Sequence, residues 1–232
     1  MRLEENNYKK YELKVSERYA LNVKFENHYT EQEVNIILIE IRNAIKYVFG
    51  ERYNYPNINI KVVDELKING YTINGVYNPN TLKLSIATKN IGTIFKLRNI
   101  ICHELVHVKF AFDNLSRVMR IISGDISLYY VNEFWACKIS REYSNDIKDA
   151  NIFKNLNLDY ELKVWETSNI ENKKMFATSV CSCILENDEI DNVLENNKKY
   201  FELKRKIEEI GFNPTENDLE MLEKELLKLN LI

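Results

Sequence analysis

Apolar residues recur at helical spacing in residues 34–49, which read VNIILIEIRNAIKYVF. Thr30 and Glu33 form a capping-box pattern ahead of this segment, and Gly50 follows it. A capping box favours the start of a helix, and a glycine favours its end. The pattern therefore predicts an amphipathic helix that begins near Thr30 and ends before Gly50.

Two later segments have the pattern of β-strands. Residues 57–64, NINIKVVD, read as a strand, and residues 81–87, TLKLSIA, alternate apolar and polar positions like a half-buried strand. The Asn-Gly pair at residues 74–75 predicts a hairpin turn, and the Asn-Pro-Asn at residues 78–80 predicts a second turn. Residues 1–29 are charged and aromatic, and they read as strand or loop.

Helices dominate the rest of the chain. Residues 93–112, TIFKLRNIICHELVHVKFAF, contain no glycine or proline and are apolar on almost every face, which is typical of a buried helix. Gly124 then interrupts the chain, and residues 125–144 predict a second helix. The C-terminal part is predicted to be wholly helical, with segments at residues 172–186, 192–210 and 216–230.

These elements predict an α+β fold, in which a small twisted sheet and its helices are followed by a helical C-terminal part. We expect residues 1–149 to form the first domain. We expect residues 150–232 to form a helical extension, which can also pack as part of the same domain.

Composition and charge narrow the class of protein. Hydrophobic residues make up 45% of the 232 residues and charged residues 29%, and the net charge of -3 gives no basic surface for nucleic acid. The N-terminal stretch MRLEENNYKKYELK lacks the apolar core of a signal peptide. No segment approaches the roughly 18 apolar residues of a membrane span. We therefore expect a cytoplasmic protein with no nucleic-acid or membrane partner, whose four cysteines are buried free thiols.

Candidate chemistry is concentrated in the buried helix, where two of the chain's three histidines lie four residues apart. His103 and His107 share one helix face, so both imidazoles can reach one metal ion. Glu104 lies about 100° further round the helix, where it can act on water without binding the metal. Two core histidines are the alternative, but they would place unpartnered polar groups in an apolar helix. The spacing favours a Zn²⁺ site with Glu104 as the general base.

A third metal ligand has two candidates. Asp113 lies six residues after His107, but the glycine that would turn the chain back is replaced by Phe110. If the helix continues, Asp113 points away from the histidines. Glu133 lies on the second predicted helix, and the small Ala136 one turn later allows close helix approach. We therefore predict a His103, His107 and Glu133 site of the His₂Glu type.

Other residues are weaker candidates. An acyl-transfer site needs a donor for the oxyanion, and Tyr130 is the predicted one, although Tyr129 shares the same helix region and packing roles are the alternative. Asp125 could orient a zinc histidine. His28 is distant in sequence and is read as a surface or core histidine.

The segments HELVH, NEFWA and NGVYNPNTLKLSIA together resemble the ImmA/IrrE group of small bacterial and phage zinc metallopeptidases, and gluzincins generally. The resemblance covers residues 57–143. It implies a compact zincin fold, with zinc ligands at His103, His107 and Glu133 and the base at Glu104. It also implies that residues 81–87 form the edge strand that binds peptide, with an internal strand as the alternative. Characterised members cut a cytosolic repressor protein.

Two functions of different classes follow. The first is a cytosolic zinc endopeptidase that hydrolyses a narrow protein substrate, such as a phage or mobile-element repressor. The second is a non-catalytic zincin-fold module that regulates a partner, as in a toxin–antitoxin or phage-control pair. Glu104 discriminates between them, since an inactive module has no need of the base. Its presence favours the enzyme.

Overall fold

The computed structural model describes residues 7–50, 55–68, 70–89, 91–114, 120, 124–144, 174, 177–178, 180–181, 184, 198–229 and 231. The chain divides into two compact units: unit 1 is Met1–Phe112 with Ile139–Asp146, and unit 2 is Asp113–Lys138 with Ile147–Ile232. Helix α4 (Ile126–Ser144) contributes residues to both units. The predicted domain boundary between residues 149 and 150 lies outside the described residues and stays a prediction.

Unit 1 contains a five-stranded mixed sheet. The neighbouring strands are, in order, β1 (Tyr8–Lys14), β2 (Ala20–Glu26), β3 (Asn59–Val63), β7 (Lys83–Ala87) and β6 (Gly75–Asn78). The two outer pairs, β1 with β2 and β6 with β7, are antiparallel, and β3 is parallel to both of its neighbours. The short strands β4 (Leu66–Ile68) and β5 (Tyr71–Ile73) pair separately. A mixed sheet together with helices confirms the predicted α+β class.

The sheet buries one face because its apolar residues alternate in register across the strands. Leu21, Val23 and Phe25 are buried along β2, and polar residues occupy the positions between them. Val23 lies beside Ile60 of β3, and Ile60 lies beside Leu84 of β7. Since successive side chains point to opposite faces, these residues form one continuous apolar layer.

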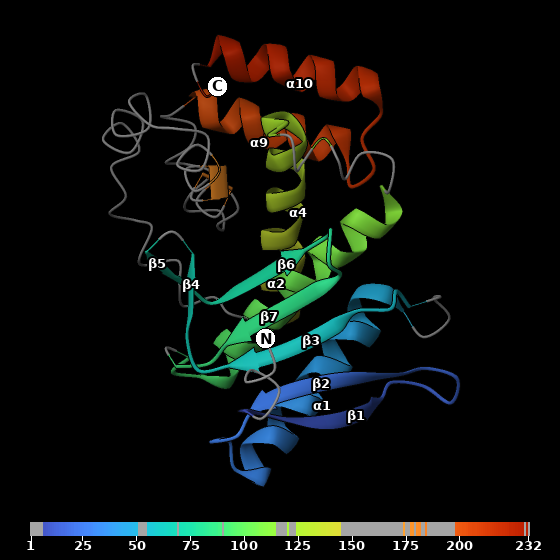
Figure 1. Ribbon diagram of the computed structural model, residues 1–232. Coiled ribbons are helices and arrows are strands. Elements are labelled where there is room, and N and C mark those ends of the chain that lie inside the picture. The colour runs from blue at the N-terminus through green and yellow to red at the C-terminus, as the bar shows by residue number, and fades with distance from the viewer. Residues whose placement is uncertain are drawn as a thin grey trace. The chain divides into compact units, whose positions relative to one another are not determined.

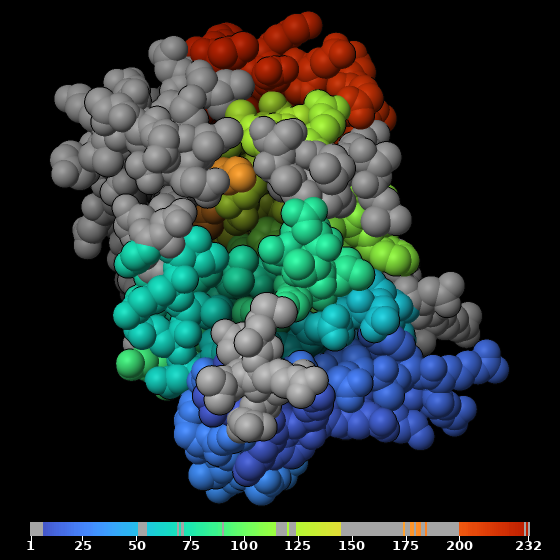
Figure 2. All heavy atoms as spheres, in the orientation of Figure 1, coloured from blue at the N-terminus to red at the C-terminus, as the bar shows by residue number. Residues whose placement is uncertain are grey.

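Two helices lie on the far side of the sheet from the viewer in Figure 1: α1 (Glu31–Phe49) and α2 (Ile94–Asp113). On the near side, the blue to blue-green atoms of the strands form much of the surface of unit 1 (Figure 2). The capping box predicted at the start of α1 is confirmed, since the Glu33 amide donates to the Thr30 hydroxyl and the Thr30 amide donates to the Glu33 carboxylate. Gly50 ends this helix with a φ of 73°, as a C-terminal glycine permits.

Helix α2 is buried on nearly all sides, as its uninterrupted apolar sequence predicts. Leu105, Val106 and Phe110 have no exposed surface. Arg98 extends from this helix and donates two hydrogen bonds, of 2.7 and 3.0 Å, to the buried Glu40 carboxylate of α1. This paired charge connects α1 to α2 and so helps to fix the helix that carries both histidines.

One prediction about the strands is wrong, and of the two alternatives for residues 81–87 the internal strand is confirmed. Strand β7 forms within the predicted residues 81–87, but it lies between β3 and β6 and is therefore not an edge. The Asn-Gly pair at residues 74–75 is not a hairpin turn, because Gly75 begins β6, and β5 and β6 do not pair with each other. The predicted Asn-Pro-Asn turn at residues 78–80 is confirmed, because the hairpin that joins β6 to β7 turns at residues 79–82 and the Thr81 amide donates to the Asn78 carbonyl. Residues 8–26, read as strand or loop, form β1 and β2.

Unit 2 is helical in its described residues. Besides the first part of α4, it contains α9 (Lys198–Ile210) and α10 (Glu216–Lys228), which contact each other. Thr215 caps α10 with a reciprocal pair of hydrogen bonds to Asp218, and the positive φ of Gly211 marks the end of α9. Most of the helix predicted at residues 172–186 lies outside the described residues. None of the helices within the described ranges combines the length and apolar character that a membrane span requires.

Candidate metal centre

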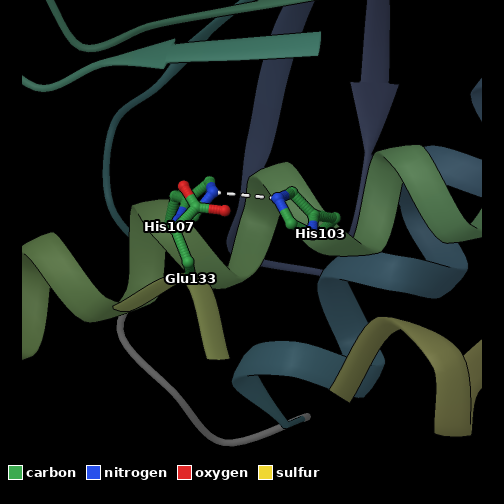
Figure 3. A group of neighbouring side chains, drawn as sticks. All are labelled: His103, His107 and Glu133. Carbon is green, nitrogen blue, oxygen red and sulfur yellow. Dashed lines mark hydrogen bonds between the residues drawn. The ribbon is translucent and has the colours of Figure 1, made fainter. Parts of the chain in front are cut away.

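His103 and His107 converge from one face of α2 (Figure 3). Their Nε2 atoms are 3.0 Å apart, and their ring planes are nearly perpendicular. The i, i+4 spacing places the two rings one helical turn apart, and both extend toward the same point. Two imidazole nitrogens at this separation can bind one ion, since tetrahedral zinc holds its nitrogen ligands about 3.4 Å apart.

Glu133 completes a group that can hold a metal ion. The ligand atoms of His103, His107 and Glu133 all lie within 4.8 Å of one another. In Figure 3 the Glu133 carboxylate points toward the two rings. Glu133 comes from α4 and is buried, at 5% exposed, whereas both histidines are partly exposed. Two imidazoles and one carboxylate are a donor set that suits zinc and leaves a fourth position for water or substrate.

Burial and neighbouring charge keep His103 in the form that binds a metal. Burial lowers the pKa of His103 well below its ordinary value, and His107 and the Arg141 guanidinium lower it further. A neutral imidazole has a free lone pair, whereas a protonated imidazole has none to offer a metal. His103 therefore stays available as a ligand in mildly acidic solution. Arg141 was not among the residues singled out from the sequence.

Glu104 lies on α2 next to His103 but is not a member of the metal-binding group. The helix turns its side chain about 100° away from that of His103. Its side chain is buried and lies against Gly75, the first residue of β6. A carboxylate beside a metal group, yet outside it, is placed to exchange protons and not to bind the ion.

Tyr129 and Thr178 support Glu133 within unit 2. The Tyr129 hydroxyl is hydrogen-bonded to Glu133, and it lies 3.1 Å from the Thr178 hydroxyl. Burial, followed by the charge of Glu133, raises the pKa of Tyr129 well above its ordinary value. The hydroxyl therefore keeps its proton and can donate a hydrogen bond to the Glu133 carboxylate. The Thr178 hydroxyl donates to the Lys174 carbonyl at 3.1 Å. Such outer hydrogen bonds orient metal ligands.

Tyr130, predicted to be the oxyanion donor, has no exposed surface. Burial raises its pKa, and Cys181 and Tyr200 of unit 2 add to the increase. Its hydroxyl is buried with no hydrogen-bond partner among the described residues. The catalytic role of Tyr130 stays a prediction, and the hydrogen bond to Glu133 favours its neighbour Tyr129 as the tyrosine that acts on the metal centre.

The remaining candidate residues, Asp113, Asp125 and His28, are not members of the metal-binding group. Asp113 is the last residue of α2, so the helix continues past Phe110 without the turn that Asp113 would need to reach the histidines. Asp125 accepts from the Leu128 amide at the start of α4 and pairs with Arg120 at 2.7 Å. It therefore caps a helix. His28 is half exposed and lies near Glu26, which fits the surface role expected for it.

No protein-family model matches this chain, and no curated protein matches it.

Proposed function

We propose that the chain is a zinc-dependent metallopeptidase of the His₂Glu type, with a zincin-like fold, that hydrolyses peptide bonds of a narrow protein substrate. One observation carries the proposal. Two histidines and a glutamate have their ligand atoms within 4.8 Å, and a second buried glutamate, Glu104, lies beside them without belonging to the group. A purely structural metal site uses four protein ligands and has no need of an adjacent base.

His103, His107 and Glu133 would hold the ion. A bound zinc polarises a substrate carbonyl and lowers the pKa of water. Glu104 takes the proton from the water that attacks the carbonyl carbon, and it carries that proton to the leaving amine. The low exposure of Glu104, at 7%, strengthens its interactions with charge in the site, because little bulk solvent screens them.

Strand β6 is the edge on which an extended peptide would add. It ends the five-stranded sheet and pairs only with β7 in the described part of that sheet. The Ala87 amide donates to the Asn74 carbonyl at 2.8 Å, one position beyond the pair of Gly75 with Ile86, so this hydrogen bond continues the register. Hydrogen-bonded and non-hydrogen-bonded pairs alternate along an antiparallel ladder, so the next pair, Gly75 with Ile86, is non-hydrogen-bonded. The N–H and C=O of Gly75 therefore face the outer edge, where a substrate strand can bind them.

A Glu104→Gln variant tests the proposal. Glutamine is nearly isosteric but cannot accept a proton, so peptide hydrolysis should fall by about 10²–10⁴-fold while zinc stays bound. The assay is the appearance of new N-termini in a library of proteins, read by mass spectrometry, with zinc content and Tm measured alongside. On the resemblance alone, bacterial and phage repressor proteins are the first substrates to include.

Glu220→Gln is the matched control, since Glu220 is exposed on α10. It should cut at the rate of the wild type. Equal rates for Glu104→Gln and the wild type would show that Glu104 is not the base. If the wild type cuts nothing in the library, while zinc is bound, the result would favour a non-catalytic regulatory module.

A further inference from the structure

Gly75 leaves no room for a side chain. A Cβ atom placed on it would lie 2.6 Å from both Cγ and Oε1 of Glu104, and 2.8 Å from Cδ. Real Cβ atoms essentially never approach other heavy atoms within 3.0 Å. The backbone of β6 thus passes directly against the side chain of the proposed base, and any residue larger than glycine would overlap it.

Backbone conformation does not explain this glycine. The glycines that adopt a positive φ among the described residues are Gly50, Gly70, Gly124 and Gly211, and Gly75 is not one of them. Gly75 is extended, at the start of a strand, where glycine is unfavourable relative to most residues. A glycine inside a strand often marks the close approach of another group. Here that group is the Glu104 side chain.

We infer that Gly75 is a positioning residue for Glu104, and that the bare backbone of β6 sets where the carboxylate lies. This inference rests on the proposed function, because it assigns the role through the base. The edge strand that would bind substrate and the base that would act on it then touch at a single point. A peptide paired with β6 would lie one strand spacing, about 4.8 Å, from the backbone that contacts the base.

The surroundings determine what gives way when a side chain is added at Gly75. Helix α2 cannot shift readily, because Leu105 and Val106 beside Glu104 are completely buried. Strand β6 is held to β7 by the antiparallel ladder. Cγ of Glu104 is only two bonds from the helix backbone, so a shift of the carboxylate end alone does not remove the clash. The clash is therefore relieved by rotation of the whole Glu104 side chain. Rotation moves the carboxylate away from the reacting atoms.

Gly75→Ala should therefore lower kcat by about 10²-fold, the loss that a misplacement of roughly 1 Å produces. Zinc content should stay at the wild-type level, since Glu104 does not bind the ion. KM should change little, because alanine keeps the N–H and C=O that face the substrate edge. Gly92→Ala is the matched control: a Cβ atom added to Gly92 would meet no atom within 4 Å, and this glycine has no positive φ. It should leave kcat unchanged.

A second measurement does not depend on activity. Gly75→Ala should lower the Tm of the protein by about 2–4 °C relative to Gly92→Ala, the shift that a modest clash gives in a chain of this size. In a Glu104→Ala background, which lacks Cγ, Cδ and both oxygens, the same change should cost nothing beyond the control. Coupling of this kind identifies Glu104 as the group that Gly75 accommodates.

The outcomes separate this inference from the proposed function. If the wild type cuts substrate, and Gly75→Ala is neither slower nor coupled to Glu104→Ala, the inference is wrong and the function stands. If Gly75→Ala raises KM with kcat unchanged, Gly75 serves substrate binding and not the base, and the inference is also wrong. If no peptide is cut but the Tm values are coupled, the proposed function fails while the packing of Gly75 against Glu104 stands.

Discussion

The metal-binding group draws on two regions that are organised differently. His103 and His107 both lie on α2, so their spacing is set by the helix backbone itself. Glu133 lies on α4, where Tyr129, itself 3.1 Å from the Thr178 hydroxyl, orients its carboxylate. Thr178 is separated from Tyr129 by 49 positions in the chain. The histidine half therefore depends on local structure, and the glutamate half depends on packing between distant segments.

Removal of a ligand from the histidine half should have the largest effect. His103→Ala leaves one imidazole and one carboxylate, and we expect the purified protein to lose stoichiometric zinc. Glu133→Ala leaves both imidazoles on a helix that still holds them in place, and we expect weaker but detectable binding. Metal analysis and competition with a chelating dye measure both. Unchanged stoichiometry in both variants would end the three-ligand hypothesis.

The hydrogen bonds behind Glu133 should have an intermediate effect. Tyr129→Phe removes the hydroxyl that donates to the Glu133 carboxylate, and we expect zinc affinity to fall by about 10–100-fold. Tyr130→Phe is the matched control, since it removes a buried hydroxyl with no hydrogen-bond partner among the described residues. It should leave zinc affinity unchanged and Tm equal or higher, because a buried unpaired hydroxyl is itself unfavourable.

Two results would contradict this view of the glutamate half. Equal zinc affinity in Tyr129→Phe and the wild type would show that Tyr129 does not support the ligand. A loss of zinc affinity in Tyr130→Phe that matches or exceeds the loss in Tyr129→Phe would favour Tyr130 as the tyrosine that supports the metal site.

The smallest expected effect is the pH dependence of the zinc-free protein. The pKa of His103 is well below 6.5 in the folded chain, so the unfolded chain takes up a proton at a higher pH. Stability is retained above pH 6.5 and is lost as the pH falls below it, by at most about 1.4 kcal/mol per pH unit for one group. Denaturant unfolding at several pH values between 5.5 and 7.5 measures this slope.

The variant His103→Gln should flatten that slope, because it removes the group whose pKa is lowered. His28→Gln is the control, since His28 is half exposed at the surface and should leave the slope as it is. If the slope of His103→Gln equals that of the wild type, another group controls the pH dependence.

Much of the fold could be predicted because its signals are local. The capping box at Thr30, the uninterrupted apolar stretch of α2 and the glycine after α9 each act through neighbours within a few residues. The edge strand could not be predicted in this way. Residues 81–87 alternate like a half-buried strand, a pattern that fits an edge strand and an internal strand equally. Strand β7 pairs on both sides, and only the order of strands in the sheet shows that β6 is the edge.

The sequence by itself determined the histidine pair and the glutamate beside it, since helical periodicity converts a spacing of four residues into a shared face. Only the tertiary structure distinguished Tyr129 from Tyr130, because adjacent residues on a helix point about 100° apart and the packing decides which one meets Glu133. Only the tertiary structure explained Gly75. In the sequence an Asn-Gly pair indicates a turn, but here the missing side chain makes space for Glu104, a residue from a different element. A requirement for empty space depends on the neighbour that fills it, and that neighbour is brought there by the fold.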